Sequence, residues 1–236
     1  EIINILTGFA WMGYKNDNIN EVLYECLVGP DFETSGEING QYDYYALFNI
    51  ISSFARLSPK TTKYFSDFAP KLHNCFSMIQ KVPKEDFKSH PMLLKVMVPD
   101  LTSYVNLWLS MATFAALHPN YKNMKSMGRN FGVISDDLIK VFNSNPRWQA
   151  TEMNLQEAAN VSVAVAVLKL NGEKFIGDLG DIIRMKLAEA EAADLPNLVK
   201  SSFYMREYKY SRDIYSQVHA RATVMYSQGK IPEEIY

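Results

Sequence analysis

Two short stretches of the sequence place basic and aromatic side chains close together, at spacings that suit a helix or a turn. In the first, Tyr121 precedes Lys122, Lys125 and Arg129. The second stretch has a similar composition and consists of Arg206, Tyr208, Lys209, Tyr210 and Arg212. Lysine and arginine side chains neutralise phosphates, and tyrosine rings stack on unpaired bases. The chemistry that these residues indicate is non-covalent binding of single-stranded RNA.

The same two clusters also fit a simpler interpretation. Tyrosines often lie half-buried at the border of an amphipathic helix, while the cations beside them face water. The whole chain supports no strong preference, because 24 basic and 26 acidic residues give a net charge of -2. A nucleic-acid-binding protein is usually more basic. Both interpretations of the clusters therefore remain open at this stage.

Residue patterns of catalytic and metal sites do not occur in the sequence. The four histidines are isolated from one another and from the cysteines, at positions His73, His90, His118 and His219. The sequence has no HExxH, G-x-S-x-G, P-loop or dinucleotide-binding motif. We therefore predict a chain that is not an enzyme, with no catalytic residues, no metal site and no cofactor.

Several other features have structural interpretations. The small residues of Gly177-Asp178-Leu179-Gly180 lie in an amphipathic pattern and predict a close helix contact, not a phosphate cradle. Cys26 and Cys75 are predicted to be buried free thiols of a reducing compartment. No uncharged apolar run approaches the length of about 18 residues that a membrane-spanning helix needs.

A short pattern recurs along the chain and predicts its architecture. Its clearest copy is Ser53-Phe54-Ala55-Arg56-Leu57, and each copy ends an apolar helical run that is followed by a polar gap and a second amphipathic run. The other copies lie at residues 8–12, 113–117, 164–168 and, less regularly, 202–208. The prediction is an all-α fold, an α-α superhelix of about five irregular helical hairpins. Residues 1–236 are expected to form one helical-repeat domain with a soft boundary near residues 143–154.

Local signals refine this prediction. Pro70 lies inside a helical pattern and predicts a kink or a break near Ala69. One helix is expected over residues 175–193, and Gly172 is expected to supply a positive φ in the turn before it. The acidic, glycine-containing stretch at residues 31–41 is expected to be an exposed loop.

The repeated phrases resemble those of a known family. Ser53 to Leu57, Thr113 to Leu117 and Tyr208 to Tyr215 are similar to segments of the octotricopeptide and heptatricopeptide repeats that accompany RAP and FAST-kinase-like domains. The resemblance extends over most of the chain, although the period varies and no stretch of residues 1–236 resembles a RAP domain. It implies a component of an organellar ribosome or RNA-processing assembly, with RNA and other proteins of a large complex as partners and a mitochondrial location.

A second hypothesis comes from a different class of function. The chain could be a protein–protein scaffold, such as an accessory subunit of a respiratory or ATP synthase assembly. The near-zero net charge favours the scaffold, whereas the basic clusters and the resemblance favour association with RNA.

Overall fold

The computed structural model describes residues 1–28, 44–79, 100–145, 148–170 and 172–231. The predicted loop at residues 31–41 and the basic stretch at residues 81–89 lie outside these ranges. The chain divides into two compact units, unit 1 (Glu1–Val141) and unit 2 (Phe142–Tyr236). Each unit is described by itself.

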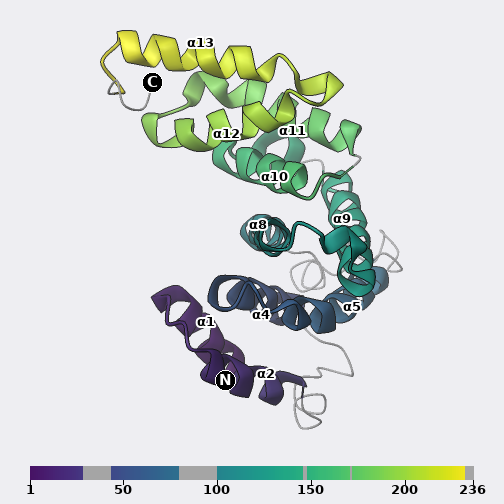
Figure 1. Ribbon diagram of the computed structural model, residues 1–236. Coiled ribbons are helices and arrows are strands. Elements are labelled where there is room, and N and C mark those ends of the chain that lie inside the picture. Colours follow the sequence, from purple (N-terminus) through teal and green to yellow (C-terminus); the bar gives the residue numbers. More distant parts are fainter. Residues whose placement is uncertain (29–43, 80–99, 146–147, 171, 232–236) are drawn as a thin grey trace, which may run out of the picture. The chain divides into compact units, whose positions relative to one another are not determined.

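Unit 1 consists of paired helices whose first members stack on one another (Figure 1). Its helices are α1 (Ile2–Met12), α2 (Asp17–Val28), α4 (Tyr44–Leu57), α5 (Thr62–Ile79), α8 (Leu101–Leu117) and α9 (Lys125–Asn143), with a 3-10 turn at Tyr121–Asn123. The helix α4 packs against α1 on one side and against α8 on the other, and α5 is its partner in the hairpin. This stacking of successive hairpins is typical of helical repeats.

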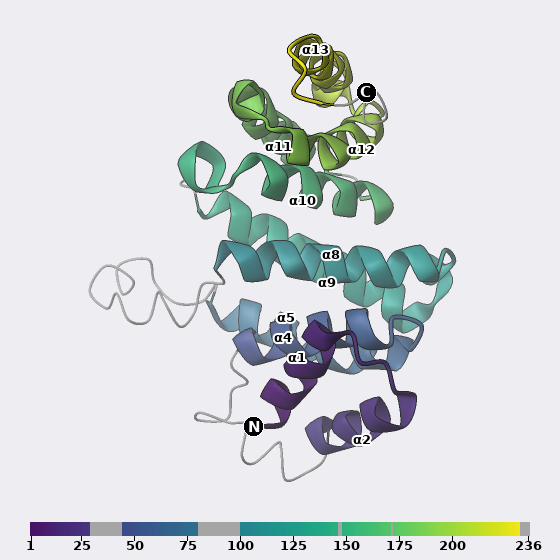
Figure 2. The same cartoon turned by 90° about the vertical axis from the view of Figure 1, so that its left-hand side faces the viewer.

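Unit 2 repeats this arrangement (Figure 2). Its elements are a π-helical turn (Trp148–Glu152), α10 (Leu155–Val167), α11 (Glu173–Lys186), α12 (Leu195–Met205) and α13 (Ile214–Ser227). The helix α10 packs against both α11 and α12, and α12 packs against α13. The described residues contain helices and turns but no strand, so the predicted all-α fold of helical hairpins is confirmed.

The repeated pattern supplies the core of unit 1. Phe54 is fully buried and stacks on Tyr64 with ring centroids 4.1 Å apart. Ala55 and Ala115, which follow the phenylalanine in two copies of the pattern, are both 3% exposed. Small side chains at these positions let neighbouring helices approach closely. Ala166, in the copy of unit 2, is only half-buried.

Polar contacts fix α2, and with it the α1–α2 hairpin, on the α4–α5 hairpin. The Asn20 side-chain amide donates a hydrogen bond to Ser58 Oγ at 2.7 Å. The Tyr24 hydroxyl donates to Asp67, and Lys63 pairs with Glu21. These side chains come from α2 on one side and from α5 or its preceding turn on the other. The first hairpin is therefore held in a defined position on the second hairpin.

Pro70 lies inside α5, and the helix continues through it to Ile79. Of the two predicted outcomes, a kink or a break near Ala69, the break is therefore wrong, and the kink stays a prediction. A proline has no backbone N–H, so the carbonyl of Ser66, four residues earlier, has no partner within the helix. The side-chain amide of Asn130 in α9 donates to that carbonyl at 3.2 Å. A contact between helices thus replaces the missing bond, and no local pattern around Pro70 could reveal it.

Two expectations for unit 2 are also corrected. Gly172 has a φ of -128°, and the positive φ belongs to Lys169, at 48°. The Leu170 N–H then reaches back to the Val165 carbonyl at 3.4 Å and closes the end of α10. The helix α11 ends at Lys186, not at residue 193, and is followed by 3-10 turns. The carbonyl of Ala190 in this segment accepts a hydrogen bond from Arg221 at 3.1 Å, a contact between distant residues.

The predictions for the small and sulfur-containing residues hold in part. A Cβ added at Gly180 would lie 2.7 Å from Ile214 Cδ1 and 2.9 Å from Ser211 Oγ, which confirms the predicted close contact. Cys75 is buried as expected, but Cys26 is exposed. Cys26 lies on a face of α2 that the rest of the described chain leaves open.

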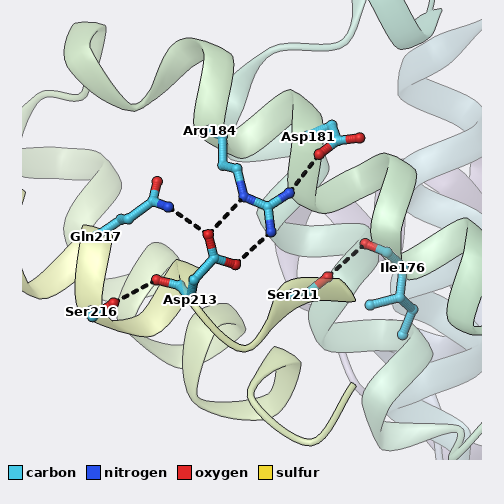
Figure 3. A network of polar contacts seen from close by, with 7 residues as sticks. All are labelled: Ile176, Asp181, Arg184, Ser211, Asp213, Ser216 and Gln217. Atoms are coloured by element: carbon cyan, nitrogen blue, oxygen red, sulfur yellow. Dashed lines mark hydrogen bonds and ion pairs between the residues drawn. The ribbon is translucent and has the colours of Figure 1, made fainter. Parts of the chain in front are cut away.

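An arginine connects α11 to the beginning of α13 in unit 2 (Figure 3). Arg184 donates from Nε and Nη2 to the two oxygens of Asp213, at 3.2 and 2.6 Å. Gln217 also donates to Asp213, at 2.6 Å, and Arg184 Nη1 reaches Asp181 at 2.5 Å. The hydrogen bonds from Arg184 lower the pKa of the Asp213 carboxyl.

This contact predicts a pH-dependent contribution to stability. Because the pKa of Asp213 is lowered by folding, its contribution is complete above the ordinary pKa of aspartate, about 3.9, and is lost as the pH falls through the folded pKa. We expect Asp213→Asn to cost about 0.5–1 kcal/mol near neutral pH, since the pair is partly exposed to solvent. The measurement is urea unfolding of both chains between about pH 7 and about pH 2.

The difference between the two chains should vanish at the acidic end of this range. Asp181→Asn is the matched control, because it leaves both hydrogen bonds between Arg184 and Asp213 in place. A difference that stays constant with pH would show that the carboxylate charge of Asp213 does not stabilise unit 2.

Candidate functional site

One surface hollow of unit 1 is a groove where α1, α4 and α8 meet. It consists of two adjoining pockets that share Ser52, Arg56 and Asn106. The larger pocket has a volume of about 400 Å³, which is enough for a few side chains. Much of its lining is small, with Ser52, Ala55 and Ser110 contributed by α4 and α8. We call this surface the α1–α4–α8 groove.

Arg56 and Trp11 form one wall of the groove. The guanidinium of Arg56 lies over the indole ring of Trp11, 5.1 Å from the ring centroid. Among the described residues, this ring is the one partner of the guanidinium, so its N–H groups make no ion pair there. Trp11 is 76% exposed, although a tryptophan side chain is largely apolar. A large apolar ring and an arginine thus face solvent together.

Neutral polar groups lie beside this wall. Asn49 and Asn106 line the smaller pocket, and their side-chain amides have no hydrogen-bond partner in the described part of the chain. The hydroxyl oxygen of Thr7, in the same pocket, is buried and also lacks a partner there. Buried polar atoms are normally hydrogen-bonded in native proteins. The groove therefore offers several donors and acceptors that the protein itself does not use.

The charged residues of the groove are all basic. Lys15 and Arg56 line the larger pocket, and no aspartate or glutamate is among the described residues that line either pocket. An anionic group entering the groove would meet two cations and no local carboxylate.

These residues were missed by the sequence analysis, but a signal for two of them is present. Trp11 and Arg56 occupy the same position in successive copies of the pattern, directly after Ala10 and Ala55. Because α1 packs against α4, equivalent positions of the two helices come side by side. A search for large exposed side chains at equivalent repeat positions would have identified this pair. Asn49 and Asn106 do not share a repeat position, and only the fold brings them together.

The structure changes the interpretation of the first basic cluster. Tyr121 is 5% exposed, and its ring packs edge-on against Phe131 at 5.0 Å between centroids. Burial also raises the pKa of its hydroxyl. The ring therefore belongs to the core of unit 1, and the expected stacking on bases is not open to it. Lys122 and Arg129 are exposed, while the side chain of Lys125 lies outside what the structure describes.

Arg129 lines a second, wider cleft between α5 and α9, together with His73 and Asn74. His73 Nδ1 lies 2.6 Å from an oxygen of Asp137, a carboxylate that is only 2% exposed. Lys140 Nζ approaches the other oxygen at 3.8 Å. The buried carboxylate orients the imidazole and joins the two helices. No serine or cysteine nucleophile is seen in contact with this histidine among the described residues.

The second basic cluster is spread over several environments. The guanidinium of Arg206 lies 3.8 Å from the centroid of the Phe203 ring and pairs with Glu207 at 3.3 Å. Tyr208 is half-buried, which raises the pKa of its hydroxyl, and that hydroxyl reaches the Leu170 carbonyl at 3.5 Å. Lys209 and Arg212 are exposed, and the side chain of Tyr210 is outside the described set. The hydroxyl of Tyr208 therefore contacts another part of the protein itself.

Other classes of site find no support in the described residues. Within those ranges, no three histidine, cysteine, aspartate or glutamate side chains come together in a way that would hold a metal ion. In the same ranges, no helix combines the length and the hydropathy needed to cross a membrane.

Comparison with known proteins adds no relative: no family model, no curated protein and no solved structure matches this chain.

Proposed function

We propose that this protein is a non-catalytic helical scaffold that binds a partner protein through the α1–α4–α8 groove. The observation that carries the proposal is the exposed pair of Trp11 and Arg56 beside unused polar groups. Tryptophan and arginine are among the residue types most enriched at the positions that dominate binding energy in protein interfaces.

Site-specific photo-cross-linking tests this proposal. A benzophenone amino acid replaces Thr113, an exposed residue that lines the larger pocket, or, as the control, the exposed Val224 of α13 in unit 2. After irradiation of cells that express the chain, position 113 is expected to give a discrete protein adduct that position 224 does not give. Mass spectrometry of the adduct identifies the partner and the cross-linked segment. Identical adducts from both positions would contradict the proposal.

Association with RNA is the second candidate function, and Arg129 is the observation that favours it. This exposed cation lines the cleft between α5 and α9, which has a volume of about 710 Å³, and exposed Lys122 lies in the turn before α9. The same cross-linking experiment distinguishes the two functions. A benzophenone in place of the exposed Asn74 labels the same cleft and leaves Arg129 intact. An adduct from position 74 that ribonuclease removes would support RNA binding and would locate it outside the groove.

The mitochondrial location stays a prediction that follows from the resemblance alone. Fluorescence microscopy of the tagged full-length protein tests it independently of the binding experiments.

A further inference from the structure

We propose that the α1–α4–α8 groove binds an extended peptide segment and recognises one acidic side chain of that segment through Arg56. This inference rests on the proposed scaffold function and specifies the chemistry of the partner. Its evidence is the arrangement of hydrogen-bonding groups, the charge of the lining and the geometry of the arginine.

The polar groups of the groove match a peptide backbone in extended conformation. A side-chain amide carries both donors and an acceptor, so one asparagine can pair with the N–H and the C=O of the same chain. Asn49 from α4 and Asn106 from α8 line the same pocket, and the amides of both are unengaged in the described structure. A strand-like segment has free backbone groups on its edges, whereas a bound helix uses its own internally. Two amides from neighbouring helices therefore favour an extended ligand.

The floor of the groove lets a backbone approach closely. Ser52, Ala55 and Ser110 have short side chains, and Ser110 is already turned inward, where it donates to the Asn106 carbonyl at 2.6 Å. Larger side chains at these positions would fill the space above α4 and α8. The long side chains, Trp11 from α1 and Arg56 from α4, form a wall of the groove.

The geometry of Arg56 suits a carboxylate. A guanidinium that stacks on an aromatic ring uses its flat face, so the N–H groups in its plane stay available for hydrogen bonds. Two parallel N–H groups match the two oxygens of a carboxylate. The guanidinium of Arg56 lies over the Trp11 ring, 5.1 Å from its centroid, and the second cation, Lys15, adds to the positive charge of the same groove. No carboxylate in the described lining competes for these groups.

Binding of two peptide pools to the full chain tests this inference. The first pool consists of fluorescent nonapeptides, acetylated and amidated, with aspartate or glutamate at the centre and mixed flanking residues. The second has asparagine or glutamine at the centre. Fluorescence polarisation should show at least tenfold tighter binding of the acidic pool, and Arg56→Gln should remove this preference. Asn106→Leu should weaken both pools alike, since it removes a contact to the backbone.

Controls separate this inference from the proposed function. Arg206→Gln changes an exposed arginine of unit 2 and should leave both pools unaffected. Thermal unfolding verifies that Arg56→Gln and Asn106→Leu remain folded. If both pools bind equally and Asn106→Leu weakens both, the scaffold function stands but the acidic specificity is refuted.

Three further outcomes overturn the inference. Failure of both pools to bind rejects the extended peptide, and the cross-link at position 113 then decides whether a folded partner uses the groove. Tighter binding of peptides with a free C-terminal carboxylate than of the internal acidic pool would show that Arg56 binds the carboxylate at the end of a peptide chain. Equal competition by single-stranded oligouridylate would assign the groove to nucleic acid.

Discussion

Phe54→Ala is expected to lower the free energy of unfolding by about 3–5 kcal/mol, because it removes a fully buried aromatic side chain and leaves a cavity. The ring is 0% exposed and contacts the rings of Tyr64 and Phe68, at 4.1 and 6.4 Å between centroids. Tyr24 of α2 also approaches it, at 6.4 Å. The substitution therefore loosens the contact between two hairpins of unit 1. Urea unfolding followed by circular dichroism measures the change.

Trp11→Ala is the matched control, because it truncates a larger ring at an exposed position of the same unit. It should change stability by less than about 1 kcal/mol, since the lost contact with Arg56 is at the surface. Equal losses for the two variants would mean that Phe54 is not the centre of the aromatic core. Trp11→Ala is expected instead to reduce partner binding, which separates its role from that of Phe54.

Gly128→Ala and Gly132→Ala are expected to change stability in opposite directions, although both glycines lie in α9. A Cβ at residue 128 would lie 2.8 Å from the backbone oxygen of Lys122 and 3.1 Å from its Cα. Backbone atoms cannot move aside cheaply, so we expect a loss of about 1–3 kcal/mol from overpacking. A Cβ at residue 132 meets nothing within 4 Å, so the better helix propensity of alanine should add about 0.5–1 kcal/mol.

The same unfolding assay measures both glycine variants. A gain for Gly128→Ala would show that the turn at Tyr121–Asn123 does not press against α9 in solution. The two variants also test the arrangement of the first basic cluster. The contact between Gly128 and the backbone of Lys122 sets the position of Lys122 relative to Arg129 on α9.

The sequence was sufficient for the all-α architecture because its main signal is local. Apolar residues at three- and four-residue steps describe the buried face of each helix, and the recurring pattern around Phe54 and Ala55 marks how hairpins stack. One expectation that failed depends on a contact between distant residues. The helix through Pro70 persists because Asn130, sixty residues later, supplies a hydrogen bond. Nothing near Pro70 carries that information.

The candidate site was harder to predict for the same reason. The sequence indicated the basic clusters because their residues are close together along the chain. In the structure, Tyr121 lies in the core, and Arg206 contacts Phe203 and Glu207. The groove combines residues from three helices that are far apart along the chain. Of the groove residues, only Trp11 and Arg56 could be identified from the sequence, because they share a position in the repeated pattern.

The central claim, that a partner protein binds in the α1–α4–α8 groove, is tested most directly by reversing one charge there. Tagged full-length chains with Arg56→Glu or Arg206→Glu are recovered from the same cells, and the partner identified by cross-linking at position 113 is quantified. We expect at least a tenfold loss of that partner with Arg56→Glu and no change with Arg206→Glu. Undiminished recovery with Arg56→Glu, or loss of the partner on ribonuclease treatment, would contradict the claim.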